Sequence, residues 1–307
     1  MNGNVSPQSE EYISRINRVL DYIEMHLSKK FSLDELAKVA CFSKYHFHRI
    51  FQALLKESLF AFIQRLRVEK AARFLSANPE ISITEVAMSC GFSSSQAFAR
   101  SFRERFQMTA TEWRQARSKS TSQGFEALTY RPYAVPTSLE PCPLLVRDVE
   151  VRAFDPEELA YVRYVGPYAG DAALFQGLYA ALYRWALPRR LISSTTKHLV
   201  IYHDSIDITD EDKLRISACI SIPKETPVQG KIGKMTLEGG VYAVGRFKLD
   251  ATEYYQAWSW MYASWMPLSG FQPDDRPSFE YFPPKHDASN DDTSRMTVEI
   301  CIPIKPF

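Results

Sequence analysis

The stretch Ser32-Leu33-Asp34-Glu35-Leu36-Ala37 occurs a second time, in altered form, as Ser82-Ile83-Thr84-Glu85-Val86-Ala87. In each copy a serine precedes an apolar pattern, and a glutamate follows the serine by three residues. This spacing is typical of a capping box, in which the serine hydroxyl accepts from the glutamate amide while the glutamate carboxylate accepts from the serine amide. The repeat therefore predicts two copies of one small helical unit.

Each copy leads through a turn into a second helix. The turns contain Cys41-Phe42-Ser43 and Gly91-Phe92-Ser93, and the helices contain Phe47-His48-Arg49-Ile50-Phe51 and Phe98-Ala99-Arg100-Ser101-Phe102. The offset between the copies grows by one residue across the turn, so we expect the second turn to be longer. A continuous helix is predicted between the copies, over 59–75, and an amphipathic helix before them, because Ile13, Ile16, Leu20, Ile23 and Leu27 recur at helical spacing.

Both second helices have one apolar face and one polar face. Phe47, Ile50, Phe51 and Leu54 are predicted to point inward in the first copy, and Phe98 and Phe102 in the second. The opposite faces carry Arg, Gln, Lys, Ser, Tyr and His, which suit a major groove, because Arg and Gln pair with base edges and Lys neutralises phosphates. The alternative is a pair of amphipathic hairpins with merely solvated polar faces. The candidate DNA-contacting residues are Lys44, Tyr45, His48, Arg49 and Gln52 in the first copy, and Ser95, Gln96, Arg100 and Arg103 in the second.

Charge separates the two ends of the chain. Residues 1–117 carry 17 Lys and Arg against 12 Asp and Glu, a net of +5, whereas residues 118–307 carry 20 against 24, a net of −4. A basic region next to an acidic one favours a DNA-binding domain followed by a domain with another role. Between them, residues 118–145 are rich in Ser, Thr and Pro and predict a linker.

Composition excludes several other classes of protein. We expect neither a signal peptide nor a membrane span, and the five scattered cysteines without a CxxC pair favour free thiols in the cytoplasm. The sequence has no P-loop, nucleophile elbow or HExxH motif, so no catalytic residue, metal site or cofactor is expected.

The last 160 residues or so predict strands and helices in a repeated order. Strands are expected at 146–154, 159–165, 198–202 and 214–222 around a helix at 172–187, and again at 231–237, 241–249, 278–282 and 296–304 around a helix at 252–266. Two ββαββ units indicate a pseudo-twofold α+β domain with a cleft between its halves.

One carboxylate stands out in this second domain. Glu280 lies between Phe279 and Tyr281 and is predicted to face the opposite side of its strand. A carboxylate on an apolar strand is costly unless it is paired, and a cationic ligand with aromatic neighbours would satisfy it. The alternative is an ordinary aromatic core in which Glu280 pairs with an arginine such as Arg246. The candidate effector-binding residues are Tyr168, Trp185, Trp258, Tyr262, Glu280 and Tyr281.

These motifs resemble known families. Residues 10–117 resemble the double helix-turn-helix domain of the AraC/XylS family, through the two capping boxes, Phe42-Ser43-Lys44-Tyr45-His46-Phe47-His48-Arg49, Cys90-Gly91-Phe92, Phe98-Ala99-Arg100-Ser101-Phe102-Arg103-Glu104-Arg105-Phe106 and Glu112-Trp113-Arg114. The resemblance implies that the two second helices are recognition helices that enter successive major grooves. The chain departs from the pattern at Cys41, where a turn glycine is usual, and at 56–59 and 108–111, which lack the usual Gly and Pro.

Residues 146–307 resemble the GyrI-like effector-binding domain, through Tyr164-Val165-Gly166-Pro167-Tyr168, Ile201-Tyr202-His203-Asp204, Gly239-Gly240-Val241-Tyr242, Phe279-Glu280-Tyr281-Phe282 and Val298-Glu299-Ile300-Cys301. The order of the two domains resembles that of the Rob-type regulators.

Together the patterns predict a multidomain regulator: an all-α double helix-turn-helix domain at 1–117, a linker at 118–145 and a GyrI-like domain at 146–307. We expect double-stranded DNA, a small amphipathic or cationic effector and RNA polymerase as partners, an activating role, and a monomer on DNA because one chain supplies two recognition helices. Two alternatives remain open: a hydrolase that uses Glu280 as general base, and a second domain that binds a protein partner and no ligand.

Overall fold

A computed structural model describes residues 7–77, 80–119, 141–206, 208–284 and 295–306. The chain divides into two compact units, Met1–Ala134 and Val135–Phe307. The predicted linker lies mostly outside the described residues, so its bounds stay a prediction. Within the described ranges, no helix has the length and apolar character that crossing a membrane requires.

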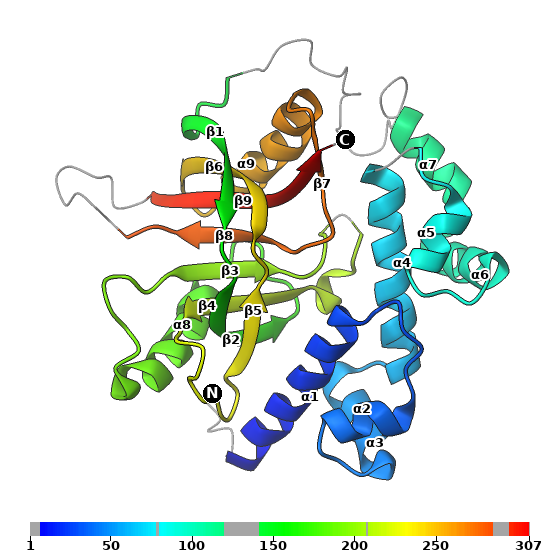
Figure 1. Ribbon diagram of the computed structural model, residues 1–307, viewed down its shortest axis with the longest axis horizontal. Coiled ribbons are helices and arrows are strands. Elements are labelled where there is room, and N and C mark those ends of the chain that lie inside the picture. The colour runs from blue at the N-terminus through cyan, green and yellow to red at the C-terminus, as the bar shows by residue number, and fades with distance from the viewer. Residues whose placement is uncertain (1–6, 78–79, 120–140, 207, 285–294, 307) are drawn as a thin grey trace. The chain divides into compact units, whose positions relative to one another are not determined.

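The first unit is all-α, as predicted (Figure 1). Its helices are α1 (Pro7–Met25), α2 (Leu33–Val39), α3 (Lys44–Leu55), α4 (Leu59–Ala77), α5 (Ile83–Ser89), α6 (Ser95–Phe106) and α7 (Ala110–Lys119). The two turns that precede α3 and α6 differ by one residue, because α2 ends at Val39 and α5 at Ser89. The predicted helix order and the longer second turn are confirmed.

Serine caps begin both short helices. The Ser32 Oγ accepts from the Glu35 amide at 3.1 Å, and the Ser82 Oγ accepts from the Glu85 amide at 3.0 Å. The Glu35 carboxylate is held in turn by the Tyr22 hydroxyl at 2.6 Å, which lowers the pKa of that carboxyl and ties α2 to α1. The serine half of each predicted capping box is therefore confirmed, and it marks where each helix-turn-helix begins.

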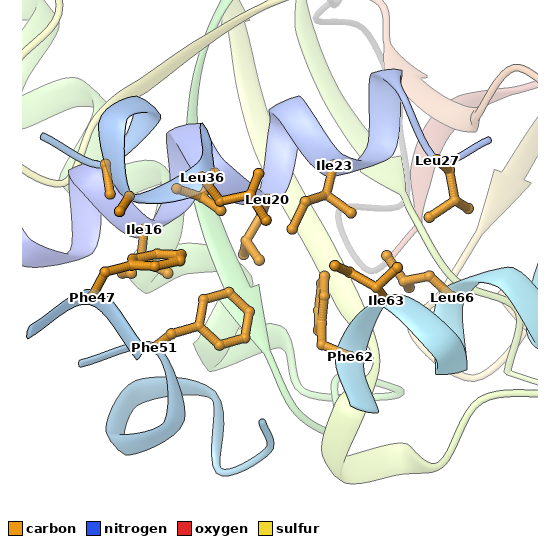
Figure 2. Close-up of a cluster of buried hydrophobic side chains, with 13 residues drawn as sticks. Ile16, Leu20, Ile23, Leu27, Leu36, Phe47, Phe51, Phe62, Ile63 and Leu66 are labelled. Carbon is orange, nitrogen blue, oxygen red and sulfur yellow. The ribbon is translucent and has the colours of Figure 1, made fainter. Parts of the chain in front are cut away.

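The core of the first copy gathers one face from each of four helices. Ile16, Leu20, Ile23 and Leu27 from α1 and its end meet Phe47 and Phe51 of α3, Leu36 of α2, and Phe62, Ile63 and Leu66 of α4 (Figure 2). Phe51 and Phe62 pack edge to face with ring centroids 5.5 Å apart. Leu54, which the periodicity placed on this face, is 43% exposed, so that prediction is wrong: in the last turn of α3 it is the neighbouring Leu55 that packs against this core.

The two turns each contain a residue in the left-handed backbone conformation, but a different residue type adopts it in each. Gly91 has φ +85°, and Cys41 has φ +52°, a left-handed conformation that glycine adopts without strain. A Cβ on Gly91 would come within 2.8 Å of the Leu27 oxygen and the Ser28 Cα, so the second turn packs against the end of α1. Lys56 and Gln107, the C-cap residues of α3 and α6, are also left-handed, so two of the left-handed residues, Cys41 and Lys56, lie where the chain departs from the family pattern.

The second unit is an antiparallel α+β domain, as predicted. Its first half contains β1 (Leu145–Phe154), β2 (Glu157–Val165), α8 (Ala172–Ala186), β3 (His198–Tyr202) and β4 (Arg215–Ser221). Its second half contains β5 (Gly233–Leu237), β6 (Gly240–Leu249), α9 (Tyr254–Trp260), β7 (Phe271–Pro273), β8 (Ser278–Phe282) and β9 (Met296–Pro306). The predicted ββαββ repeat is confirmed. Its second helix is shorter than expected, because a π-helical turn, Met261–Trp265, follows α9, and β7 is an additional strand.

The strand order makes the pseudo-twofold symmetry explicit. The order is β1-β6-β9-β8-β3-β4-β2-β5, so the first strand of each half pairs with the second strand of the other half. The pseudo-axis passes between β3 and β8, where Val200 pairs with Glu280. The loops that join β1 to β2 and β5 to β6 cross near this axis, since a Cβ on Gly239 would meet the Phe154 oxygen at 2.8 Å.

Both helices of this unit cover the same face of the sheet. Ala218, Val200, Glu280 and Ile300 form one row across four neighbouring strands. Ala218 lies in the cluster under α8 and Ile300 in the cluster under α9. Glu280 therefore sits in the middle of the helix-covered face, on the strand next to the pseudo-axis.

Candidate DNA-binding and effector-binding sites

Helices α3 and α6 expose most of the predicted contact residues. His48, Arg49 and Gln52 are exposed on α3, while Phe47 and Phe51 of the same helix are buried. Gln96, Arg100 and Arg103 are exposed on α6, with Phe98 and Phe102 buried behind them. In both copies, phenylalanines four residues apart bury one face of the helix, and the polar face is left exposed to solvent.

Three of the predicted contact residues need separate description. Lys44 is exposed and lies 3.8 Å from Asp34 of α2. Ser95 is half-buried, with its Oγ 3.5 Å from the Thr84 hydroxyl of α5. The side chain of Tyr45 lies outside the described residues, so its predicted role stays a prediction.

Arg49 and Arg100 occupy matching places in the two repeats. Each lies two residues after the first buried phenylalanine of its helix and two before the second. Arg49 also lines a hollow of about 310 Å³ with Tyr12, Phe42 and Ile50. No ion pair of either arginine is found among the residues that the structure describes, which leaves both guanidinium groups available to a base edge or a phosphate.

Glu280 of the second unit is buried and accepts two hydrogen bonds. The residue is only 2% exposed. The Trp258 Nε1 donates to Oε1 at 2.7 Å, and the Tyr202 hydroxyl donates to Oε2 at 2.8 Å. Burial raises the pKa of Glu280 to about 7, against the opposing effect of the two hydrogen bonds. The carboxyl is therefore close to half-ionised at neutral pH.

Aromatic rings connect this carboxyl with the surface. Tyr168 and Tyr202 have ring centroids 5.6 Å apart, and Tyr202 packs edge to face on Trp258 at 5.6 Å. Trp258 stacks on Tyr262 at 6.2 Å, and Tyr262 is 43% exposed. The charge of Glu280 contributes, after burial, to raising the pKa of Tyr168. Three predicted aromatics therefore gather at Glu280, as do residues that the sequence did not single out, Tyr202 and Tyr254.

Two predicted aromatics lie elsewhere. Trp185 of α8 belongs to the core cluster that contains Ala160 and Ile220, and Arg189 lies over its ring at 5.3 Å. Tyr281 pairs with Leu199 and Glu299 on the opposite face of the sheet from Glu280. The structure does not bring either residue to the carboxyl, so a role for them in effector binding stays a prediction.

The alternative pairing of Glu280 with Arg246 is not what the structure shows. Arg246 binds Glu299, with its Nε donating to Oε1 at 2.9 Å, and Arg152 donates to the other oxygen at 2.8 Å. Glu299 lies on the face opposite Glu280, because the two are not in the same row of the sheet. Among the described residues, Glu280 has neutral hydrogen-bond donors and no cationic partner.

Comparisons with known proteins match both units. Residues 36–116 match a helix-turn-helix domain family, and residues 147–305 match the family described as GyrI-like small molecule binding domain. The chain is 31% identical over 116 residues to the uncharacterized HTH-type transcriptional regulator YbfP of Bacillus subtilis, covering 38% of this chain and 39% of that protein. It is 33% identical over 106 residues to the probable transcriptional regulator LumQ of Photobacterium leiognathi, covering 34% and 42%.

A solved structure of the DNA-binding domain of AdpA, a global transcriptional factor, in complex with a target DNA is 29% identical, with a TM-score of 0.34, covering 36% of this chain and 99% of that one. The chain spans about two fifths of the length of the curated relatives it matches. The match to the GyrI-like family extends over more than half of the residues. The chain therefore belongs to the GyrI-like family and carries an AraC-type helix-turn-helix domain ahead of its GyrI-like domain.

Proposed function

We propose that this protein regulates transcription by binding DNA through α3 and α6, in response to a cationic amphipathic molecule bound at Glu280. The observation that carries the DNA-binding part is the duplicated arrangement of an exposed arginine between two buried phenylalanines, at Arg49 and at Arg100. Two helices of one chain can supply what dimeric regulators supply with two, half-sites about one DNA turn apart. We therefore propose that one chain binds one asymmetric site.

The salt dependence of binding tests this part. Lys and Arg contacts to phosphate release counterions from the DNA, and this release becomes less favourable as the salt concentration rises. We therefore expect the affinity to fall at least about tenfold between roughly 50 and 200 mM salt. Gel shifts with the full chain measure the loss. Equal affinity at both salt concentrations would contradict the proposal, and two chains on a minimal site, seen by sedimentation, would contradict the monomer.

The effector part rests on the surroundings of Glu280. A buried carboxyl near half-ionisation has a favourable partner in a cation, and the neighbouring rings of Trp258, Tyr202 and Tyr168 offer faces for cation–π contact. A flat cationic molecule would form an ion pair with the carboxylate, and the attraction would offset the desolvation penalty of the lone charge. A cleft that admits it between the two halves stays part of the proposal.

Calorimetry with a matched pair of ligands tests the role of Glu280. A cationic dye and a neutral analogue of the same shape are titrated into wild type and Glu280→Gln. We expect the variant to weaken the cationic ligand by about 1–3 kcal/mol and the neutral one much less, because only the charge is removed. Equal losses would mean that Glu280 has a structural role only.

The pH dependence of binding gives a second test. The ionised fraction of a carboxyl with a pKa of about 7 rises from roughly one tenth at pH 6 to nine tenths at pH 8. The affinity for a cation should therefore rise by about tenfold over this range in wild type and stay flat in Glu280→Gln.

We also propose an activating role, RNA polymerase as a partner and a cytoplasmic location. These three proposals rest only on the class of protein, a transcriptional regulator.

A further inference from the structure

A buried charge network joins the ends of the two recognition helices. Glu57 lies two residues after the last residue of α3, and Arg105 is the penultimate residue of α6. Between them, on one turn of α4, lie Arg65 and Glu69, whose side chains are 8% and 5% exposed. The network therefore begins at the carboxyl end of one recognition helix, crosses α4 and ends at the carboxyl end of the other.

The contacts within this network run in a single line. The Arg65 guanidinium donates to both Glu57 oxygens, at 2.6 and 3.2 Å, and to the Glu69 Oε2 at 3.2 Å. The other Glu69 oxygen accepts from the Arg105 Nη2 at 3.4 Å. Glu69 is thus the one residue of this line that contacts both the first-copy side, through Arg65, and the second-copy side, through Arg105.

Such a network is a poor way to gain stability. Two carboxylates and two guanidinium groups must be desolvated, and buried ion pairs of this kind are often matched or exceeded in stability by apolar residues of similar size. What charge-assisted hydrogen bonds add is direction, because they fix angles as well as distances. The ring contacts at the same helix, such as Phe51 on Phe62, allow more sliding than a forked guanidinium contact.

Angular precision matters for two helices on one DNA. One base pair rotates the groove by roughly 34°, since a turn contains about 10.5 base pairs. A recognition helix that drifted by that angle would meet the wrong base edges. We propose that Glu69 is a positioning residue that holds α3 and α6 at the separation and angle of two successive major grooves. This inference deepens the proposed function, on which its consequence for DNA rests.

The distance between the two helices tests the inference without DNA. Spin labels are placed at Ala53→Cys on α3 and Ala99→Cys on α6, both exposed positions, after Cys41 and Cys142 are changed to serine. Pulsed electron paramagnetic resonance on the full chain should give one narrow distribution of distances between the two labels. Glu69→Gln should broaden the distribution at least about twofold. Glu104→Gln removes the same negative charge at an exposed position of α6 and should leave the distance distribution narrow.

A second variant guards against a folding defect in the first. Arg105→Leu removes only the second-copy end of the line, at a side chain that is 24% exposed, and should broaden the distances as Glu69→Gln does. A narrow, unshifted distribution in either folded variant would overturn the inference. The steric contact of Gly91 with the end of α1 would then be sufficient to set the geometry.

Binding to DNA provides the functional counterpart. On a two-part site, wild type should lose at least tenfold in affinity when one base pair is inserted between the parts, and Glu69→Gln should lose less than threefold. Unchanged spacing discrimination in Glu69→Gln would overturn the inference. If wild type binds no such site while the distances broaden as expected, the proposed function fails and the positioning role stands.

Discussion

Arg49 and Arg100 project into solvent from the first unit, whereas Glu280 is enclosed in the second. The difference matches what each group is proposed to meet. A DNA duplex brings its own charge and is reached by an exposed surface, so the arginines need only be placed. A small cation must be bound tightly by few contacts, so its partner carboxylate is kept in a poorly solvated site where each contact is stronger. Substitution at the exposed sites should change binding alone, and substitution at buried sites should change stability too.

The largest effect is expected at a buried backbone contact of the first unit. Gly91→Ala places a methyl group 2.8 Å from the Leu27 oxygen and forces alanine into a left-handed conformation. We expect the free energy of unfolding to fall by about 2–4 kcal/mol. Urea denaturation followed by circular dichroism measures it. A loss below about 1 kcal/mol would show that the end of α1 can move away from the turn.

The next effect is expected from the pH dependence of stability at Glu280. The folded pKa of about 7 lies above the value of 4.5 for the free side chain, so the folded state binds more protons between these values. Stability is therefore lost as pH rises through this window, by about 3 kcal/mol in all.

Glu280→Gln should remove this loss, so the comparison is made between the two pH profiles. Tryptophan fluorescence reports mainly on the second unit, which contains four of the five tryptophans. Parallel profiles for wild type and Glu280→Gln between about pH 5 and 8 would refute the buried, raised-pKa carboxyl.

The exposed arginines should behave in the opposite way. Arg49→Ala and Arg100→Ala are each expected to cost about 1–3 kcal/mol of specific DNA binding, and Gln52→Ala less. Stability should change by less than about 0.5 kcal/mol, because the side chains are exposed. Fluorescence anisotropy with specific and random DNA separates the two effects. Retained discrimination in both arginine variants would exclude them as base-reading residues.

The smallest effect is expected at the first turn. Cys41→Gly relieves the left-handed strain at φ +52° but increases the entropy of the unfolded chain, so a net gain of about 0.5–1 kcal/mol is expected. Cys41→Ala, which keeps the Cβ, is the control and should give no gain. Equal stability of the glycine and alanine variants would mean that the turn is unstrained.

The sequence predicts the elements of both units better than their assembly. The limits of β3 and β8 agree with the predicted 198–202 and 278–282, because a short run of apolar and aromatic residues marks each strand. The exchange of first strands between the two halves depends on long-range pairing, which no local pattern reports. The aromatic ring of Trp185 favours a binding role in the sequence, and only the packing of α8 shows that it enters the core.

The residues missed at Glu280 show the same limit. Tyr202 lies two residues after Val200, and an offset of 80 residues relates Val200 to Glu280 in the repeat. Antiparallel pairing of these two central strands would have placed Tyr202 near the carboxyl. The repeat was visible in the sequence, but the pairing of its two middle strands was not. The exposure of the candidate DNA-contacting residues was easier to predict, because exposure on an amphipathic helix follows from its periodicity.

The most direct test of the central claim is the enrichment of sites from random DNA by the full chain, with wild type, Arg49→Ala and Arg100→Ala in parallel. Wild type should enrich two half-sites whose centres are about 10 base pairs apart. Arg49→Ala should lose sequence preference in one half-site and Arg100→Ala in the other. A wild type that enriches no sequence, or a single motif that both variants leave intact, would contradict the account.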